Sequence, residues 1–135
     1  MKIDRLVDTN ILIYAYDSQS AFHSKAVTFL QEPNINFYIT TKNISEFFAV
    51  LTKLNQSYKD ISLFYDDIKR NTTILYPEKK SLQILEMLLQ KYQPRGNRVF
   101  DIEIVSIALS NGIETIATIN EKDFKPISEI KLHDF

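Results

Sequence analysis

The sequence predicts an α/β fold in which helices cover both faces of a parallel sheet. Two observations lead to this prediction. Short β-rich runs alternate with amphipathic helical segments along the chain, a pattern typical of parallel sheets with crossover helices. The chain has 135 residues, enough for a sizeable core, and shows no internal repeat, low-complexity tract or linker. We therefore expect a single domain over residues 1–135.

Five segments have the composition of strands. They cover residues 3–8, 36–41, 72–77, 114–120 and, as a candidate last strand, 130–135. The first runs into a turn or a helix start at "ILIYAY". Pro77 closes the third segment, "TTILYP".

Five further segments have apolar residues at helical spacing. They cover residues 20–31, 43–54, 59–70, 79–93 and 101–112. The pattern is clearest in "KKSLQILEMLLQKYQ". Ser18 or Ser20 is the expected N-cap of the first helix, and Pro33 follows its end. Gly112 is the expected C′ residue of the last helix.

Composition narrows the class of protein. There is no cysteine, which excludes disulfides and thiolate metal sites and fits a cytoplasmic location. The N-terminus does not read as a signal peptide, and no apolar run approaches the ~20 residues that span a bilayer, so we expect a soluble protein. The net charge of −1 gives no support for a nucleic-acid partner, although a basic rim around an acidic pocket would cancel in this sum.

Polar residues fall where the carboxyl ends of the predicted strands meet. Asp8 ends the first strand, Glu46 lies early in the helix after the second, and Asp101 opens a later helix. Asn120 ends the strand "TIATIN", with Asp123 shortly beyond. Ligands of open α/β sheets bind at this edge. Converging carboxylates repel one another unless cations lie between them, and oxygen ligands favour Mg²⁺ or Mn²⁺. The pattern indicates metal-assisted hydrolysis of a phosphodiester.

Each acid also has a purely structural interpretation. Asp8 has Thr9 and Asn10 after it, a sequence that favours a capped turn. Glu46 stands three residues after Asn43, which is the spacing of a capping box.

For the remaining candidates the structural interpretation is equally simple. Asp101 would be favoured by the helix dipole, and Asp123 by an exposed loop. Weaker candidates for a role in function are His23, His133, Lys42, Arg95 and Arg98. The two arginines flank the loop before Asp101, where they would hold phosphates or stay solvated.

Three segments together resemble a known family. "VDTNILIYAYD", "TTKNISEFFAVL" and "RVFDIEIVSIALSNGIETIATINEKDF" resemble a PIN domain, and in size a VapC-type toxin ribonuclease of type II toxin-antitoxin systems. The resemblance covers essentially the whole chain. It implies a three-layer α/β fold and an acidic cluster that binds Mg²⁺ or Mn²⁺ and cuts single-stranded RNA.

The resemblance also implies roles for individual residues. Asp8, Glu46 and Asp101 match the first three acids of the family, with Asp8 and Asp101 as metal ligands. The fourth position, often Asp, is Asn120 here, and Asp123 follows three residues later. Whether Asn120, Asp123 or both support a metal stays open at this stage.

Further expectations come from the same likeness. Asn10 and Ser45 resemble residues that orient the acids, and Arg98 is the expected substrate contact. A metal-activated water would attack phosphorus. Glu46 and the region of Asn120 and Asp123 would orient the water or a second ion. A small antitoxin protein would cover the acidic groove, and a homodimer is expected.

Three other protein classes share some of these sequence features with the nuclease. A haloacid-dehalogenase-type phosphatase needs a second Asp where this chain has Asn10. A receiver domain would use acids such as Asp4 and Asp8 with a downstream Lys arrangement that is not evident. The stronger alternative is a PIN-fold protein with weak or no catalysis that acts as an RNA- or protein-binding module, since Asn120 replaces an acid.

Overall fold

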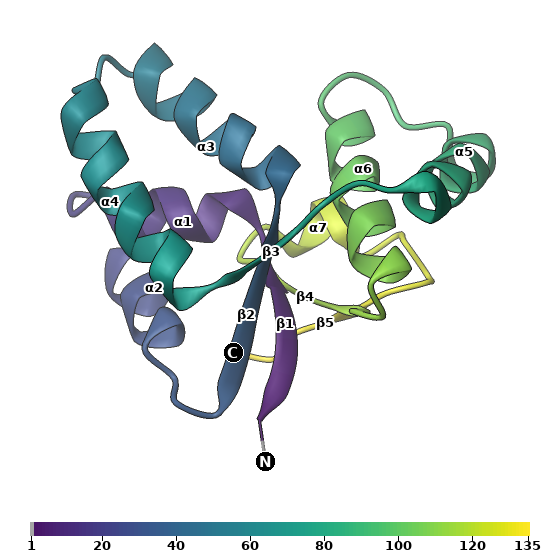
Figure 1. Ribbon diagram of the computed structural model, residues 1–135, viewed down its shortest axis with the longest axis horizontal. Coiled ribbons are helices and arrows are strands. Elements are labelled where there is room, and N and C mark those ends of the chain that lie inside the picture. Colours follow the sequence, from purple (N-terminus) through teal and green to yellow (C-terminus); the bar gives the residue numbers. More distant parts are fainter. Residues whose placement is uncertain (1) are drawn as a thin grey trace.

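A sheet of five parallel strands forms the centre of the molecule (Figure 1). The computed structural model describes residues 2–135. The strands are β1 (Ile3–Val7), β2 (Ile35–Thr40), β3 (Thr73–Leu75), β4 (Thr115–Ala117) and β5 (Lys131–Leu132), in the order β3-β2-β1-β4-β5. The chain builds outward from β1 through β2 to β3 and then returns to the other side of β1. The point where the strand order reverses therefore lies between β1 and β4, the usual ligand site of such sheets.

Helices cover both faces of this sheet, as the sequence predicts. One face carries α1 (Thr9–Tyr16), α2 (His23–Leu30), α3 (Thr41–Lys53) and α4 (Tyr58–Asn71). The other carries α5 (Lys79–Tyr92), α6 (Arg98–Ser110) and the short α7 (Glu121–Phe124). Figure 1 shows these two groups of helices on either side of the strands. The three-layer α/β arrangement is confirmed.

The two faces have separate apolar cores because side chains alternate along each strand. On β1, Val7 packs with α1 to α4, whereas Leu6 packs with α5 and α6. On β4, Ala117 packs in the same core as Val7, and Ile116 packs in the same core as Leu6. This burial on both faces explains why the central strands read as nearly continuous apolar runs.

Several local predictions are corrected by the structure. The stretch after the first strand is the complete helix α1, and α7 is a helix that the sequence pattern did not reveal. Neither Ser18 nor Ser20 is an N-cap: Phe22 takes that position, and its N–H donates to the Ser20 hydroxyl at 3.1 Å. A bend at Ser20 precedes the helix instead of a cap.

The C-terminal end of α6 follows the prediction. Asn111 is its C-cap and Gly112 follows with φ +76, a left-handed conformation that glycine adopts without strain. The start of α6 differs, since it lies at Arg98 and not at Asp101. No helix among residues 2–135 is long and apolar enough to cross a membrane.

Candidate active site

Asp8 lies directly after β1, at the point where the strand order reverses. Its backbone N–H donates to the carbonyl of Ala117 at 2.9 Å, which ties the loop after β1 to the end of β4. Asp8 is only 5 % exposed, and its Oδ2 accepts a hydrogen bond from the Thr118 hydroxyl at 2.8 Å. Burial and the charge of Glu46 raise the pKa of Asp8 to about 6, although the Thr118 hydrogen bond opposes this change.

Asp101 reaches the same edge from the first turns of α6. Burial is the largest cause that raises its pKa, to about 7, and the charges of Asp8, Glu46 and Asp123 add to it. Arg98, one turn earlier, opposes this rise. The other three carboxylates therefore lie within electrostatic range of Asp101, at the edge of the sheet where the sequence places them.

Asp123 comes to the site from α7. It lines a small hollow with Asp101 and Arg98, and its Oδ1 lies 3.5 Å from Nη2 of Arg98. Asp123 therefore belongs to the acidic cluster, and the interpretation of it as an isolated loop acid is wrong.

Glu46 comes to the site from α3. Its Oε1 accepts a hydrogen bond from the Thr9 hydroxyl at 3.4 Å, and Thr9 in turn accepts from Nδ2 of Asn43 at 2.9 Å. Burial raises the pKa of Glu46, whereas the positive charge of Lys42 lowers it. Glu46 is thus held by a chain of polar contacts that links α3 to the start of α1.

The capping box of α3 does not involve Glu46. The box joins Thr40, the N-cap, to Asn43: the Asn43 N–H donates to the Thr40 hydroxyl at 3.2 Å. The Thr40 N–H donates in return to Oδ1 of Asn43 at 2.8 Å. Glu46 lies a turn further along, so the capping-box interpretation of Glu46 is wrong and its carboxylate is left for the site.

Among residues 2–135, three predicted site residues have no side-chain hydrogen bond to an acid. Ser45 is exposed, and its hydroxyl donates to the Thr41 carbonyl within its own helix. Asn10 is half-buried, and its backbone N–H helps to lower the pKa of Asp8. The Asn120 N–H donates to the Thr118 hydroxyl at 3.0 Å. Asn10 and Asn120 therefore join the site through backbone groups.

The residues that orient the acids are ones that the sequence analysis missed. They are Thr9, Thr40, Asn43 and Thr118, all of them nearly or fully buried. Buried hydroxyl and amide groups need partners, and these groups find them in the carboxylates and in one another. A buried polar residue beside a strand end is the signal that would have pointed to them.

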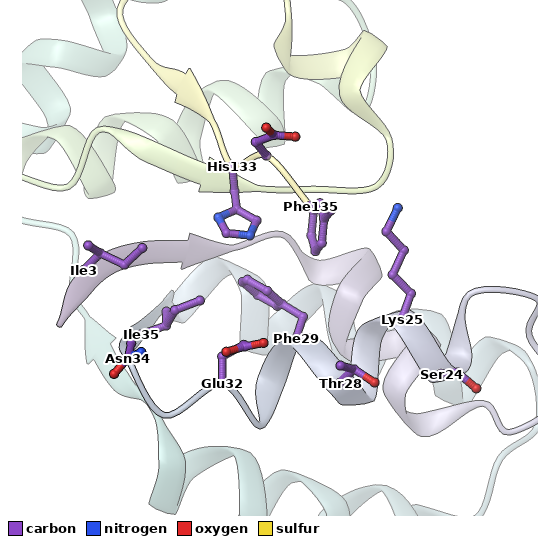
Figure 2. Close-up of a pocket in the computed structure, with 11 residues that line it drawn as sticks. Ile3, Ser24, Lys25, Thr28, Phe29, Glu32, Asn34, Ile35, His133 and Phe135 are labelled. Carbon is purple, nitrogen blue, oxygen red and sulfur yellow. The ribbon is translucent and has the colours of Figure 1, made fainter.

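The two histidines have hydrogen-bond partners other than the acids. Nδ1 of His23 lies 2.9 Å from the Tyr14 carbonyl, and Nδ1 of His133 accepts from Nε of Arg5 at 2.9 Å. Figure 2 shows His133 and Phe135 pointing toward Phe29, at a pocket of about 600 Å³ that Ile3 and Ile35 also line. None of the four acids of the candidate site lines this larger hollow.

The donor set fits a hard divalent cation. All the candidate ligands are oxygens, and Arg98 and Lys42 are the cations that act on them. Within residues 2–135 no three acidic or histidine side chains stand close enough to hold an ion by themselves. Mg²⁺ is usually held by one or two carboxylates and keeps several waters. The chemistry of the donor set therefore suits a hydrated ion of this kind, which needs only one or two of these carboxylates.

Solved structures show the same fold. VapBC2 from Rickettsia felis, bound to a DNA fragment from the promoter, matches with a TM-score of 0.73 at 22 % identity, over 98 % of this chain and 99 % of that chain. VapBC-1 from nontypeable Haemophilus influenzae matches with a TM-score of 0.72 at 23 % identity, over 98 % of each chain. The Mycobacterium tuberculosis VapC20, a Sarcin-Ricin loop cleaving toxin, matches with a TM-score of 0.71 at 11 % identity, over 90 % of this chain and 94 % of that chain.

Comparison with curated proteins gives no match. Comparison with protein families gives one, the PIN domain, over residues 5–130. This range includes the whole acidic cluster and all strands except the first two residues of β1 and the terminal β5. The chain therefore belongs to the PIN domain family.

Proposed function

We propose that this chain is a metal-dependent endoribonuclease that cleaves single-stranded RNA. The observation that supports this proposal most strongly is the cluster of Asp8, Glu46, Asp101 and Asp123 at the carboxyl edge of the sheet, where burial and the charges of neighbouring acids raise the pKa of Asp8 and of Asp101. A folded protein keeps such repulsion when the cluster serves a bound cation or a reaction. Membership of a family that is typically nuclease favours the same conclusion.

Asp8 and Asp101 are the proposed ligands of Mg²⁺ or Mn²⁺. When bound, the ion would supply an activated water for attack on phosphorus and stabilise the charge on the leaving oxygen. Asp8 is suited to a fixed position, because it is buried and its Oδ2 is already oriented by Thr118. Asp123 extends the cluster from α7, with Asn120 as a further candidate donor.

The remaining residues are proposed to handle the water and the substrate. Glu46 is held by Thr9 on one carboxylate oxygen, which leaves the other to orient a water or accept its proton. Arg98 is the proposed phosphate contact: its side chain is 57 % exposed and lies next to Asp123. No covalent intermediate with the protein is needed.

The proposed biological role is that of a toxin restrained by a small antitoxin protein. Structures of the same fold include a toxin-antitoxin complex from Klebsiella pneumoniae and VapBC-5 from Mycobacterium tuberculosis, a member of the VapBC family of toxin-antitoxin systems. The acidic groove would be the surface that the antitoxin covers, and a homodimer is the proposed assembly.

Cleavage of total RNA and of a tRNA pool by the purified protein tests the proposed activity. With Mg²⁺ or Mn²⁺ we expect discrete cuts whose new 5′ ends can be mapped. The cuts should vanish with EDTA and in Asp8→Ala, and persist in Asp66→Asn, which changes an exposed acid on α4. Cuts that persist in Asp8→Ala would contradict the assigned site.

A binding module without catalysis is the second candidate. The observation that favours it is Asn120, which stands where the family often has an acid. In that case the protein would bind RNA or a protein partner, cut nothing, and take up no Mn²⁺ at the acidic cluster. Retention of Asp8, Glu46 and Asp101 in one place favours the enzyme.

A further inference from the structure

Lys42 and Phe100 meet at the mouth of the acidic cluster. Lys42 lies in the first turn of α3 and Phe100 in the first turn of α6, and Nζ of Lys42 lies 3.7 Å from the centre of the Phe100 ring. Each residue is close in sequence to an acid of the site: Glu46 follows Lys42 by one turn, and Asp101 follows Phe100 directly. The contact therefore spans the two helix starts that carry these acids.

Phe100 does not have the surroundings of a core residue. It is 36 % exposed and belongs to neither of the two apolar cores, whereas its neighbour Ile102 is 3 % exposed and packs in one of them. At an exposed site the cation–π contact with Lys42 is only weakly stabilising. The aromatic ring is therefore available to another planar group.

Two cations lie next to the carboxylates. Lys42 acts on Glu46, whose pKa it lowers, and Arg98 lies beside Asp123 with 3.5 Å between Nη2 and Oδ1. The charges of both Glu46 and Asp123 raise the pKa of Asp101. A polyanion bound at the cluster would therefore meet two positive charges beside the acids.

We propose that Phe100 stacks against an unpaired nucleobase beside the scissile phosphate, and that Lys42 contacts a phosphate of the same RNA strand. A cationic groove with an exposed aromatic ring is how proteins bind single-stranded nucleic acid. In the free protein Lys42 occupies the ring face that the base would take, so binding would transfer Lys42 to the phosphate. This inference rests on the proposed ribonuclease function and specifies that the substrate is unpaired at this position.

Binding of a short fluorescein-labelled single-stranded RNA of mixed sequence, followed by anisotropy in an Asp8→Asn background, tests the proposal. Phe100→Leu is expected to weaken binding by about 5- to 150-fold, the range for loss of one base–aromatic stack. Phe100→Trp should restore it. Phe22→Leu, at a phenylalanine that is 41 % exposed and distant from the site, is the matched control.

The salt dependence separates the roles of the two residues. Lys42→Met should weaken binding and reduce the slope of log K against log salt by about 0.7, the value for one phosphate contact on a single strand. Phe100→Leu should leave this slope unchanged. With the corresponding RNA duplex as the probe, Phe100→Leu should have no effect, because the base faces are covered.

Two outcomes would overturn the inference: Phe100→Leu binding single-stranded RNA as well as Phe22→Leu, or losing single strand and duplex equally. Cleavage in the Asp8-intact protein distinguishes this from failure of the proposed function. If the wild type cuts RNA and Phe100→Leu raises KM without lowering kcat, both proposals hold. If the wild type cuts nothing but Phe100→Leu still loses RNA binding, only the nuclease proposal fails.

Discussion

Replacing Asp8 by asparagine is expected to abolish RNA cleavage and to raise the melting temperature of the metal-free protein at pH 8. The ionised carboxylate is unfavourable where it is: Asp8 is 5 % exposed and its pKa rises from 3.8 to about 6. Such a rise costs the folded state about 3 kcal/mol once the group is ionised. The amide keeps an oxygen that can accept from Thr118 and removes one negative charge facing Glu46.

The expected gain is about 10 °C for a chain of this size. It is measured by thermal unfolding of the wild type and Asp8→Asn in EDTA, with Asp66→Asn as the control for loss of an exposed acid. An Asp8→Asn protein that melts below the wild type would show that the carboxylate stabilises the fold, and the functional interpretation of its burial would then lose its main support.

The stability of the metal-free protein is expected to fall as the pH rises from about 5 to 8. The pKa values of Asp8 and Asp101 rise from 3.8 to about 6 and about 7 in the folded protein. In this range the folded protein therefore holds protons that the unfolded chain has released, and the free energy of unfolding decreases with pH. Because Mg²⁺ or Mn²⁺ binds the ionised carboxylates, added metal should restore stability at pH 8.

Urea unfolding at pH 5, 6, 7 and 8, with EDTA or with Mn²⁺, measures this dependence. His133 has the opposite effect on stability. Burial and the charge of Arg5 lower its pKa, so its contribution to the free energy of unfolding increases as the pH rises. The informative quantity is therefore the difference in slope between the wild type and the Asp8→Asn protein. If the free energy of unfolding had the same slope against pH for both proteins in EDTA, Asp8 would not be a carboxylate whose pKa is raised by folding.

Much of the fold was predictable because its pattern is strong. The strands β1 to β4 are short β-rich runs, and the helices α3, α4 and α5 have one clear apolar face. The helix α1 was not predicted as a separate element because "ILIYAY" is apolar on nearly all sides and suits a strand or a buried helix equally. The short α7 has too few residues to show a period.

The acids of the site were predictable, but the residues that hold them were not. Asp8, Glu46, Asp101 and Asp123 follow from the rule that parallel strands end at one edge. Thr118 was not predicted as a site residue because the strand was expected to continue to residue 120. A threonine inside a strand is common and does not indicate a functional role. The strand ends at Ala117, so the Thr118 hydroxyl stands at the edge and donates to Asp8.

Small shifts of helix starts account for the other differences. The helix α3 begins at Thr41, so Asn43 completes a capping box with Thr40 and Glu46 is free. The helix α6 begins at Arg98, which places Arg98 and Phe100 in its first turn beside Asp101. Sequence patterns define helix ends only to within a few residues, whereas the chemistry of this site depends on single positions.

Manganese binding followed by electron paramagnetic resonance tests the central claim most directly, because it asks whether the acidic cluster is a metal site. The free Mn²⁺ signal should decrease when the wild-type protein or Asp66→Asn is added, and Mg²⁺ should compete. Asp8→Asn and Asp101→Asn, with folding checked by circular dichroism, should leave the signal of free Mn²⁺ unchanged. Undiminished binding in both of these variants, or no binding by the wild type at pH 8, would contradict the claim.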